Sequence, residues 1–183
     1  MKTLLTSLLF ITFFVSCKQQ EDIKLEKIIF NTDDNGCWGL CPIYHLEINN
    51  DLNTRLYVEK LLYYDSTCYE TNFEYCEPKT DSSKIGYFKG KISLQDFNNI
   101  NEFIIRNRFD TIQNSLAKMD CNDVLYKKYI LYFNQNQRKE IHYRCAENIQ
   151  LDSLSQLLYK FIEKNKLERT NDSFYLENIK SEI

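Results

Sequence analysis

The apolar residues of this chain follow two periods, one typical of strands and the other of helices. Within residues 42–49 every second residue from Tyr44 to Ile48 is apolar, while His45 and Glu47 between them are polar. This alternation predicts a half-buried strand. Short runs rich in β-branched and aromatic residues predict further strands over residues 25–31, 54–64, 83–92, 124–133 and 138–145.

A helical period appears twice. Ser93 followed three residues later by Asp96 is a capping-box-like start, and the helix that it opens is expected to end near Arg108. Its apolar face is formed by Leu94, Phe97, Ile100 (or Phe103) and Ile104. The second helix is marked by Leu151, Leu154, Leu158, Phe161 and Ile162, with lysines at its C-terminal end.

The order of these elements is strands, helix, hairpin, helix. This order predicts a single α+β domain over residues 25–167, with an antiparallel sheet and both amphipathic helices packed on one face. Residues 65–82 form a loop or small excursion within it, and residues 168–183 are either a short helix or a loose tail.

The first residues form a separate segment. Lys2 precedes an apolar run of about a dozen residues from Leu4 to Val15, too short to cross a bilayer and typical of a signal peptide. The run ends in Phe-Val-Ser-Cys, which resembles a bacterial lipobox. We therefore expect residues 1–16 to be removed, Cys17 to be lipidated, and residues 17–24 to act as a tether. An ordinary secretory signal is the alternative.

This segment also bears on location. By resemblance to Gram-negative lipoproteins, the absence of aspartate after Cys17 favours the outer membrane, facing either the periplasm or the cell surface. The acylated Cys17 would then make membrane lipid the first partner. The net charge is −3, and no basic patch with interleaved aromatics is found, which argues against a nucleic-acid partner.

Six cysteines besides Cys17 form an even set, which suggests three disulfides in an oxidising compartment. Six cysteines permit fifteen connectivities. Spacing favours Cys37–Cys41, Cys68–Cys76 and Cys121–Cys145. Chain-entropy arguments assign these loops about 2, 2.6 and 3.5 kcal/mol, together comparable to the stability of a whole domain.

One string carries a family resemblance. In GCWGLCPIY the pattern C-x-G-x-C-P-x-Y is matched by Cys37, Gly39, Cys41, Pro42 and Tyr44. With the serine-capped helix and the pair His142-Tyr143, it resembles the bacterial family called domain of unknown function 6438, over roughly residues 25–166. The chain departs from that family at Asp51-Leu52, where aspartate–glycine is usual, in the insertion 65–82, and at Cys145, where glycine is common. The resemblance implies the domain but no activity, substrate or cofactor.

The cysteine turn could carry redox chemistry. A dithiol centre usually has two residues between its cysteines and a positive surrounding that stabilises thiolate. Here three residues separate Cys37 from Cys41, and the nearest charges in the sequence are negative: Asp33, Asp34 and Glu47. The pattern disfavours a redox centre.

A zinc site is the second alternative for this turn. Cys37, Cys41 and His45 supply three ligands where a structural site needs four, and His142 is the only other histidine. Both histidines fall on polar strand faces, where a solvated imidazole is expected. We therefore expect a structural staple, after which Tyr44 enters the core.

Motifs of common enzyme classes are missing from the sequence, including the glycine-rich phosphate loop, G-x-S-x-G and H-E-x-x-H. Asp120 and Asp123 could pair as acid and base, although carboxylates are common on any surface. The pattern therefore gives no catalytic residue, no metal ligand and no cofactor.

Tyrosines in the insertion suggest binding instead. Tyr69 and Tyr75 lie in a segment that a disulfide can close, and rigid tyrosines give contact area at low entropic cost. The alternative is that these rings cover the sheet edge. Trp38 is either a lid on the core or a further contact residue.

Together these features predict a lipid-anchored cell-envelope module that binds an envelope protein or small ligand, or has a structural role, without catalysis. An unrecognised periplasmic enzyme and a thiol-redox lipoprotein using Cys37 and Cys41 are the alternatives.

Overall fold

The computed structural model describes residues 23–34, 37, 40–69, 76–117, 124–134, 136–145, 147–164 and 166–174. The strands are β1 (Leu25–Asp33), β2 (Ile43–Asn49), β3 (Asn53–Lys60), β4 (Leu62–Tyr63), β5 (Lys79–Thr80), β6 (Gly86–Lys91), β7 (Ser115–Ala117), β8 (Tyr126–Phe133), β9 (Gln137–Arg144) and β10 (Glu168–Thr170). The helices are α2 (Leu94–Arg106) and α3 (Ile149–Lys164), with the short 3₁₀ helices η1 (Ser66–Tyr69), η3 (Ser82–Lys84) and η4 (Phe109–Thr111).

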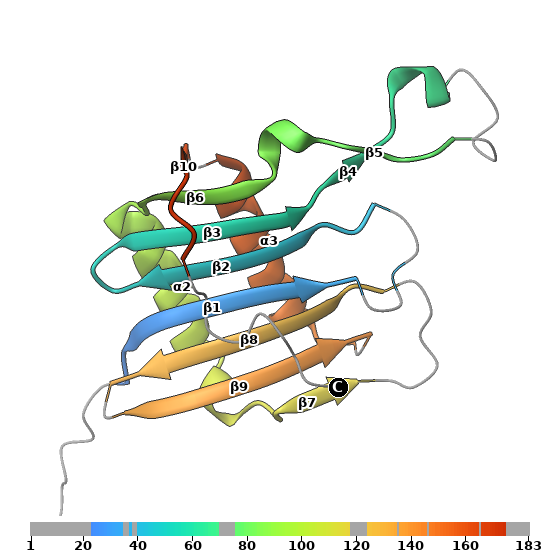
Figure 1. Ribbon diagram of the computed structural model, residues 1–183. Helices are drawn as coiled ribbons and strands as arrows, with labels where there is room; N and C mark the ends of the chain where they lie inside the picture. Colours follow the sequence, from blue (N-terminus) through green and yellow to red (C-terminus); the bar gives the residue numbers. More distant parts are fainter. Residues whose placement is uncertain are drawn as a thin grey trace, which may run out of the picture.

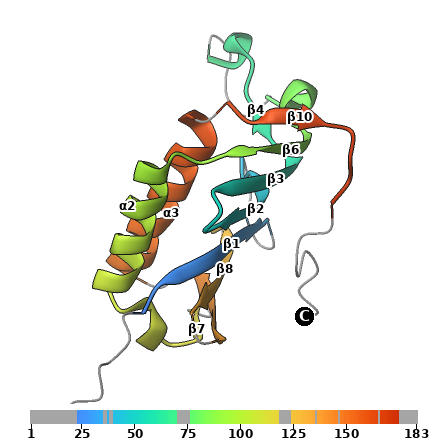
Figure 2. The same cartoon turned by 90° about the vertical axis from the view of Figure 1, so that its left-hand side faces the viewer.

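The main sheet has eight strands in the order β10-β6-β3-β2-β1-β8-β9-β7. Both helices lie on one face of it (Figures 1 and 2), which confirms the α+β class and the one-sided helical layer. Figure 1 also shows that both helices run across the strands rather than along them.

The expectation of a purely antiparallel sheet is wrong at one edge. β7 pairs with β9 in parallel, whereas the other neighbours in this sheet are antiparallel. The chain returns from α2 through η4 and reaches the outer side of β9 already running in the direction of that strand. At three residues, β7 is too short to show a period in the sequence.

The C-terminal expectation also needs correction. Residues Glu168–Thr170 form β10, which pairs with β6 at the other edge of the sheet and is neither a helix nor a loose tail. Their polar side chains show no strand pattern, because an edge strand of three residues needs no apolar side. Similarly, the strand expected over 54–64 divides into β3 and β4, and β4 pairs only with β5 in a separate two-stranded sheet.

β1 is buried on both of its faces. Ile28 and Phe30 belong to the core beneath the helices, while Ile29 points to the opposite side, and all three side chains have no exposed surface. Ile29 is paired in register with Ile130 of β8, which is equally buried. The continuous apolar run of β1 therefore reflects its position at the centre of the sheet.

The two helices are positioned by caps and apolar faces. The Ser93 hydroxyl accepts from the Asp96 backbone N–H at 3.0 Å, which confirms the expected N-cap of α2. The Asn148 side chain caps α3 in the same way by accepting from the Leu151 N–H at 2.9 Å. The expected apolar faces are confirmed except at Leu94, which is 61% exposed because it is the first helical residue, at the end of α2.

A tyrosine beneath α3 ties the helix to the sheet. The Ser155 hydroxyl donates to the Leu151 carbonyl at 2.8 Å, and the Tyr129 hydroxyl lies 2.5 Å from Ser155 Oγ. Nearby, the Tyr159 ring packs edge-on to Phe30 with centroids 5.5 Å apart. The Tyr159 hydroxyl is buried, and no partner for it is found among the described residues.

This contrast makes a prediction about two matched substitutions. Tyr129→Phe should lower the free energy of unfolding by about 1 kcal/mol, because it removes a satisfied buried hydrogen bond. Tyr159→Phe should leave stability unchanged or raise it by up to about 1 kcal/mol, because it removes a buried hydroxyl that has no partner. Urea unfolding of both variants measures the difference, and an equal loss in both would contradict this account.

Candidate functional site

Two of the three predicted disulfides are present. Cys37–Cys41 closes the signature turn with Cα atoms 6.4 Å apart, and Cys68–Cys76 closes the insertion with Cα atoms 5.7 Å apart. Cys145 is also disulfide-bonded, while its expected partner Cys121 lies outside the described residues. The Cys37–Cys41 disulfide lies in the connection between β1 and β2.

The exit from this turn is fixed by Thr32 of β1. Its buried hydroxyl donates to the Pro42 carbonyl and accepts from the Tyr44 backbone N–H, each at 2.8 Å. Both bonds hold the start of β2 against β1, at the point where the pairing of β2 with β3 shifts register between Ile43 and Tyr44. As expected, the Tyr44 side chain points to the helical side, where its ring centroid lies 6.1 Å from that of Tyr159.

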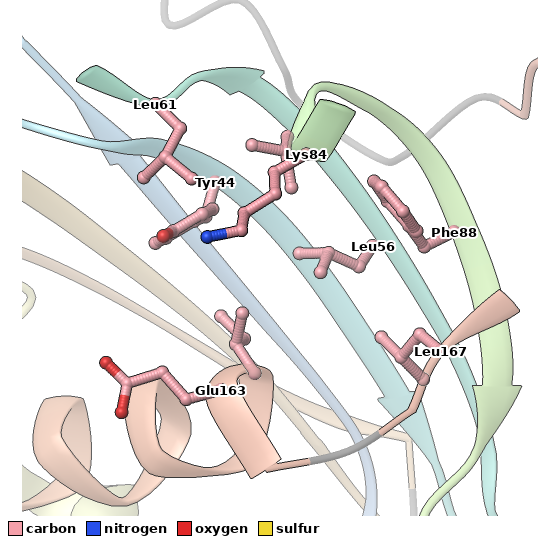
Figure 3. A pocket seen from close by; sticks show the side chains of 9 residues that line it. Tyr44, Leu56, Leu61, Lys84, Phe88, Glu163 and Leu167 are labelled. Atoms are coloured by element: carbon pink, nitrogen blue, oxygen red, sulfur yellow. The ribbon is translucent and has the colours of Figure 1, made fainter. Parts of the chain in front are cut away.

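Tyr44 leads into a pocket between the sheet and the end of α3, here called the α3 pocket (Figure 3). Its volume is about 410 Å³. It is lined by Tyr44, Leu56, Val58, Leu61, Lys84, Phe88, Ile162, Glu163 and Leu167. The lining comes from β2, β3, β6, η3, the last turn of α3 and the link from α3 to β10, so distant parts of the sequence meet here.

One wall of the α3 pocket depends on a glycine. A Cβ atom at Gly90 would lie 2.8 Å from Cδ2 of Leu167, which is shorter than any ordinary carbon–carbon contact. The missing side chain lets the link to β10 pack directly on the β6 backbone. Leu167 is thereby brought to the pocket.

The opposite wall is held by Asp81 at the start of η3. Its backbone N–H donates to the Leu61 carbonyl at 3.0 Å, and its carboxylate lies 3.2 Å from the Lys84 ammonium. The end of the insertion is therefore folded back on the end of β3. This arrangement brings Lys84 over the pocket.

The α3 pocket is apolar apart from three polar groups. These are the Tyr44 hydroxyl, the Lys84 ammonium and the Glu163 carboxylate. Burial raises the pKa of Tyr44, and the negative charge of Glu163 raises it further. The Tyr44 hydroxyl thus stays protonated at neutral pH and can both donate and accept a hydrogen bond.

His45 differs from the expectation of a solvated imidazole. It is only 4% exposed, with Nδ1 3.3 Å from Asn31 Oδ1 and Nε2 3.3 Å from Glu59 Oε2. Burial lowers its pKa, although Glu59 partly opposes this shift. Alternation along β2 misses this environment, because the Tyr57 ring that stacks on His45, 5.7 Å away, belongs to the next strand.

The negative surroundings expected for the Cys37–Cys41 turn are partly compensated. Lys60 donates to Asp34 at 2.6 Å, which neutralises one of the nearby carboxylates. Within the described residues, no group of three or more His, Cys, Asp or Glu side chains is arranged to hold a metal ion.

A chain of polar contacts lies on the face of the sheet opposite the helices. The Tyr126 hydroxyl is hydrogen-bonded to Nδ1 of His142, whose Nε2 lies 2.9 Å from Glu140. Glu140 also pairs with Lys128 at 2.7 Å and with Arg138 at 2.6 Å. Because an ionised carboxylate only accepts hydrogen bonds, Nε2 of His142 carries a proton, and in the neutral imidazole Nδ1 accepts from Tyr126.

This chain of contacts favours an ion-pair network over acid–base catalysis. Burial alone raises the pKa of Glu140, but hydrogen bonds from Lys128 and Arg138 outweigh it and lower the pKa to about 2. A carboxylate this acidic is a poor general base near neutral pH.

The network predicts a defined pH dependence. Folding lowers the pKa of Glu140 from 4.5 to about 2, so its stabilisation is complete above pH 4.5 and is lost as the pH falls toward 2. Glu140→Gln should therefore lower the melting temperature most above pH 4.5, with the difference closing toward pH 2. Glu102→Gln, on the exposed side of α2, is the control, and a pH-independent difference for Glu140→Gln would contradict the pairing.

The residues singled out from the sequence are described only in part. Cys17, Trp38, Tyr75, Asp120 and Asp123 lie outside the described residues. Of Tyr69 only the backbone, in η1, is described. The α3 pocket residues Lys84, Glu163 and Leu167 were not foreseen, since nothing in their local sequence connects the end of an insertion, a helix terminus and the link that follows it.

Comparison with known proteins adds no relative. No family model matches the chain, and no curated protein or solved structure matches it either. The resemblance to domain of unknown function 6438 thus rests on the signature residues and stays a prediction. None of the helices in the described residues is long and apolar enough to cross a membrane.

Proposed function

We propose that this chain is a lipid-anchored domain of the bacterial cell envelope that binds a small ligand non-covalently in the α3 pocket. In this proposal Cys17 carries the lipid and residues 17–24 link it to the folded domain. The domain belongs with the family called domain of unknown function 6438, and it performs no catalysis.

The α3 pocket is the observation that carries the binding role. Small-molecule sites in proteins are concave, mostly apolar and furnished with a few polar groups that fix orientation. The pocket combines six aliphatic or aromatic side chains with Tyr44, Lys84 and Glu163. Tyr44 is also the last residue of the signature C-x-G-x-C-P-x-Y, so the disulfide turn and the pocket form one structural unit.

The proposed location is supported by sequence and structure together. The signal-like run followed by Cys17 is typical of an exported lipoprotein. The disulfides Cys37–Cys41 and Cys68–Cys76 fit an oxidising compartment outside the cytoplasm. The outer membrane is the proposed site of attachment, because no aspartate follows Cys17.

The anchor predicts a simple outcome in cells. The chain should incorporate radiolabelled palmitate and fractionate with outer membranes, whereas Cys17→Ser should incorporate none and leave the membrane fraction. Replacing Cys145 is not a suitable control, because that cysteine is disulfide-bonded. Ser16→Ala, directly before Cys17, instead tests whether the lipobox-like motif accepts another small residue. Continued labelling of Cys17→Ser would contradict the proposed anchor.

The pocket predicts binding of an uncharged apolar probe. Nile red should bind the purified domain, and Ile162→Trp should weaken binding about tenfold by filling the α3 pocket, a loss near 1.4 kcal/mol. Leu157→Trp is the matched control, because Leu157 lies on the same helix but lines a different hollow, between α2 and α3. Equal loss in both variants, or no binding of the probe, would count against the pocket as the ligand site.

A further inference from the structure

The three polar groups of the α3 pocket gather toward one end, where Leu61 also lies, and most of the apolar side chains lie toward the other. In Figure 3 the Tyr44 hydroxyl, the Lys84 nitrogen and the Glu163 carboxylate lie toward one end, and Leu56, Phe88 and Leu167 lie toward the other. A ligand that fits both ends must itself be divided, with a polar head and an apolar body. This favours such a ligand over a uniformly polar one.

The polar end presents both signs of charge. Lys84 comes from η3 on one wall and Glu163 from the last turn of α3 on the other. Lys84 is paired with Asp81 at 3.2 Å, but an ammonium has three N–H donors, so two remain for a ligand. A head group with a single negative charge would be attracted by Lys84 but repelled by the carboxylates of Asp81 and Glu163, so the attraction is largely cancelled.

We propose that the α3 pocket binds a zwitterionic amphiphile, whose ammonium group pairs with Glu163 and whose anionic group pairs with Lys84 while its apolar body lies against Leu56, Phe88 and Leu167. This inference rests on the proposed binding role and adds the chemical class of the ligand. The Tyr44 hydroxyl, close enough to Glu163 for its pKa to respond to that charge, gives the head a further hydrogen-bond partner.

The size of the pocket limits the apolar body. A volume of about 410 Å³ lies at the lower end of the range for small-molecule sites. It suits one alkyl chain or one large apolar side chain, but not the two chains of a diacyl lipid. Two sources share this chemistry: a single-chain zwitterionic lipid and a free apolar amino acid.

The test compares probes that share a dodecyl chain and differ in the head. Dodecylphosphocholine, dodecyltrimethylammonium, dodecyl phosphate and dodecyl maltoside are titrated into the full domain by calorimetry, each below its micelle-forming concentration. The zwitterionic probe should bind at least about tenfold more tightly than the uncharged one. The anionic probe should bind most weakly, because Asp81 and Glu163 outnumber Lys84. Tightest binding of the cationic probe would overturn the zwitterion in favour of a simple cation. Phenylalanine, titrated in parallel, separates a free amino acid from a lipid as the source.

Two charge variants test whether Glu163 and Lys84 contact the ligand. A purely structural role would not change the affinities in a way that depends on the charge of the probe. Glu163→Gln should improve binding of the anionic probe and weaken binding of the zwitterionic probe. Lys84→Gln should improve binding of the cationic probe and also weaken binding of the zwitterionic probe. Glu102→Gln and Lys91→Gln, both exposed and outside the pocket lining, should change none of these affinities.

The outcomes separate this inference from the proposed function. Preferred binding of dodecylphosphocholine or of phenylalanine, lost in both charge variants, supports the inference and identifies the source. Equal affinity for all four dodecyl probes would overturn the zwitterion while leaving the α3 pocket as a binding site. No binding of any probe, together with no binding of Nile red, would overturn both.

Discussion

The rest of the structure depends on how α3 crosses the sheet, because its first turn contacts β8 and its last turn lines the α3 pocket. Eight strands spaced about 4.8 Å apart make a sheet about 34 Å across, whereas the 16 residues of α3 rise only about 24 Å. α3 starts over β8, where the Tyr129 hydroxyl reaches the Leu151 carbonyl. Its last turn, with Ile162 and Glu163, lies beside side chains of β2, β3 and β6, and together with Lys84 and Leu167 these line the α3 pocket.

The disulfide turn and the α3 pocket are connected through Tyr44 at the start of β2. The Cys37–Cys41 disulfide lies in the connection from β1 to β2, and the Thr32 hydroxyl bonds both the Pro42 carbonyl and the Tyr44 N–H where β2 begins. Because side chains alternate along a strand, the position of that start decides that Tyr44 faces the helices. A turn that resembles a reactive centre in the sequence thus bears on which way Tyr44 faces, through the backbone register of β2.

Features of this fold with local determinants are predictable from the sequence, and features with distant determinants are not. The cap at Ser93 and the apolar faces of α2 and α3 depend on residues three or four apart, and both were predictable. The expectation of a solvated imidazole at His45 is wrong, because Tyr57 and Glu59 on another strand contact its ring. The pocket could not be foreseen at all, since β2, η3 and the end of α3 meet only after the sheet has formed.

The edge strands of the sheet bear on whether neighbouring copies of the protein can pair edge to edge. β7 and β10 each have three residues, and β10 is charged at Glu168 and Arg169. Long, flat edges recruit strands from neighbouring molecules, whereas short charged ones do not. A lipid anchor at Cys17 would confine the protein to a plane and raise its local concentration greatly. Such crowding would turn a long continuous edge strand into a seed for polymerisation, and neither β7 nor β10 is long enough to be one.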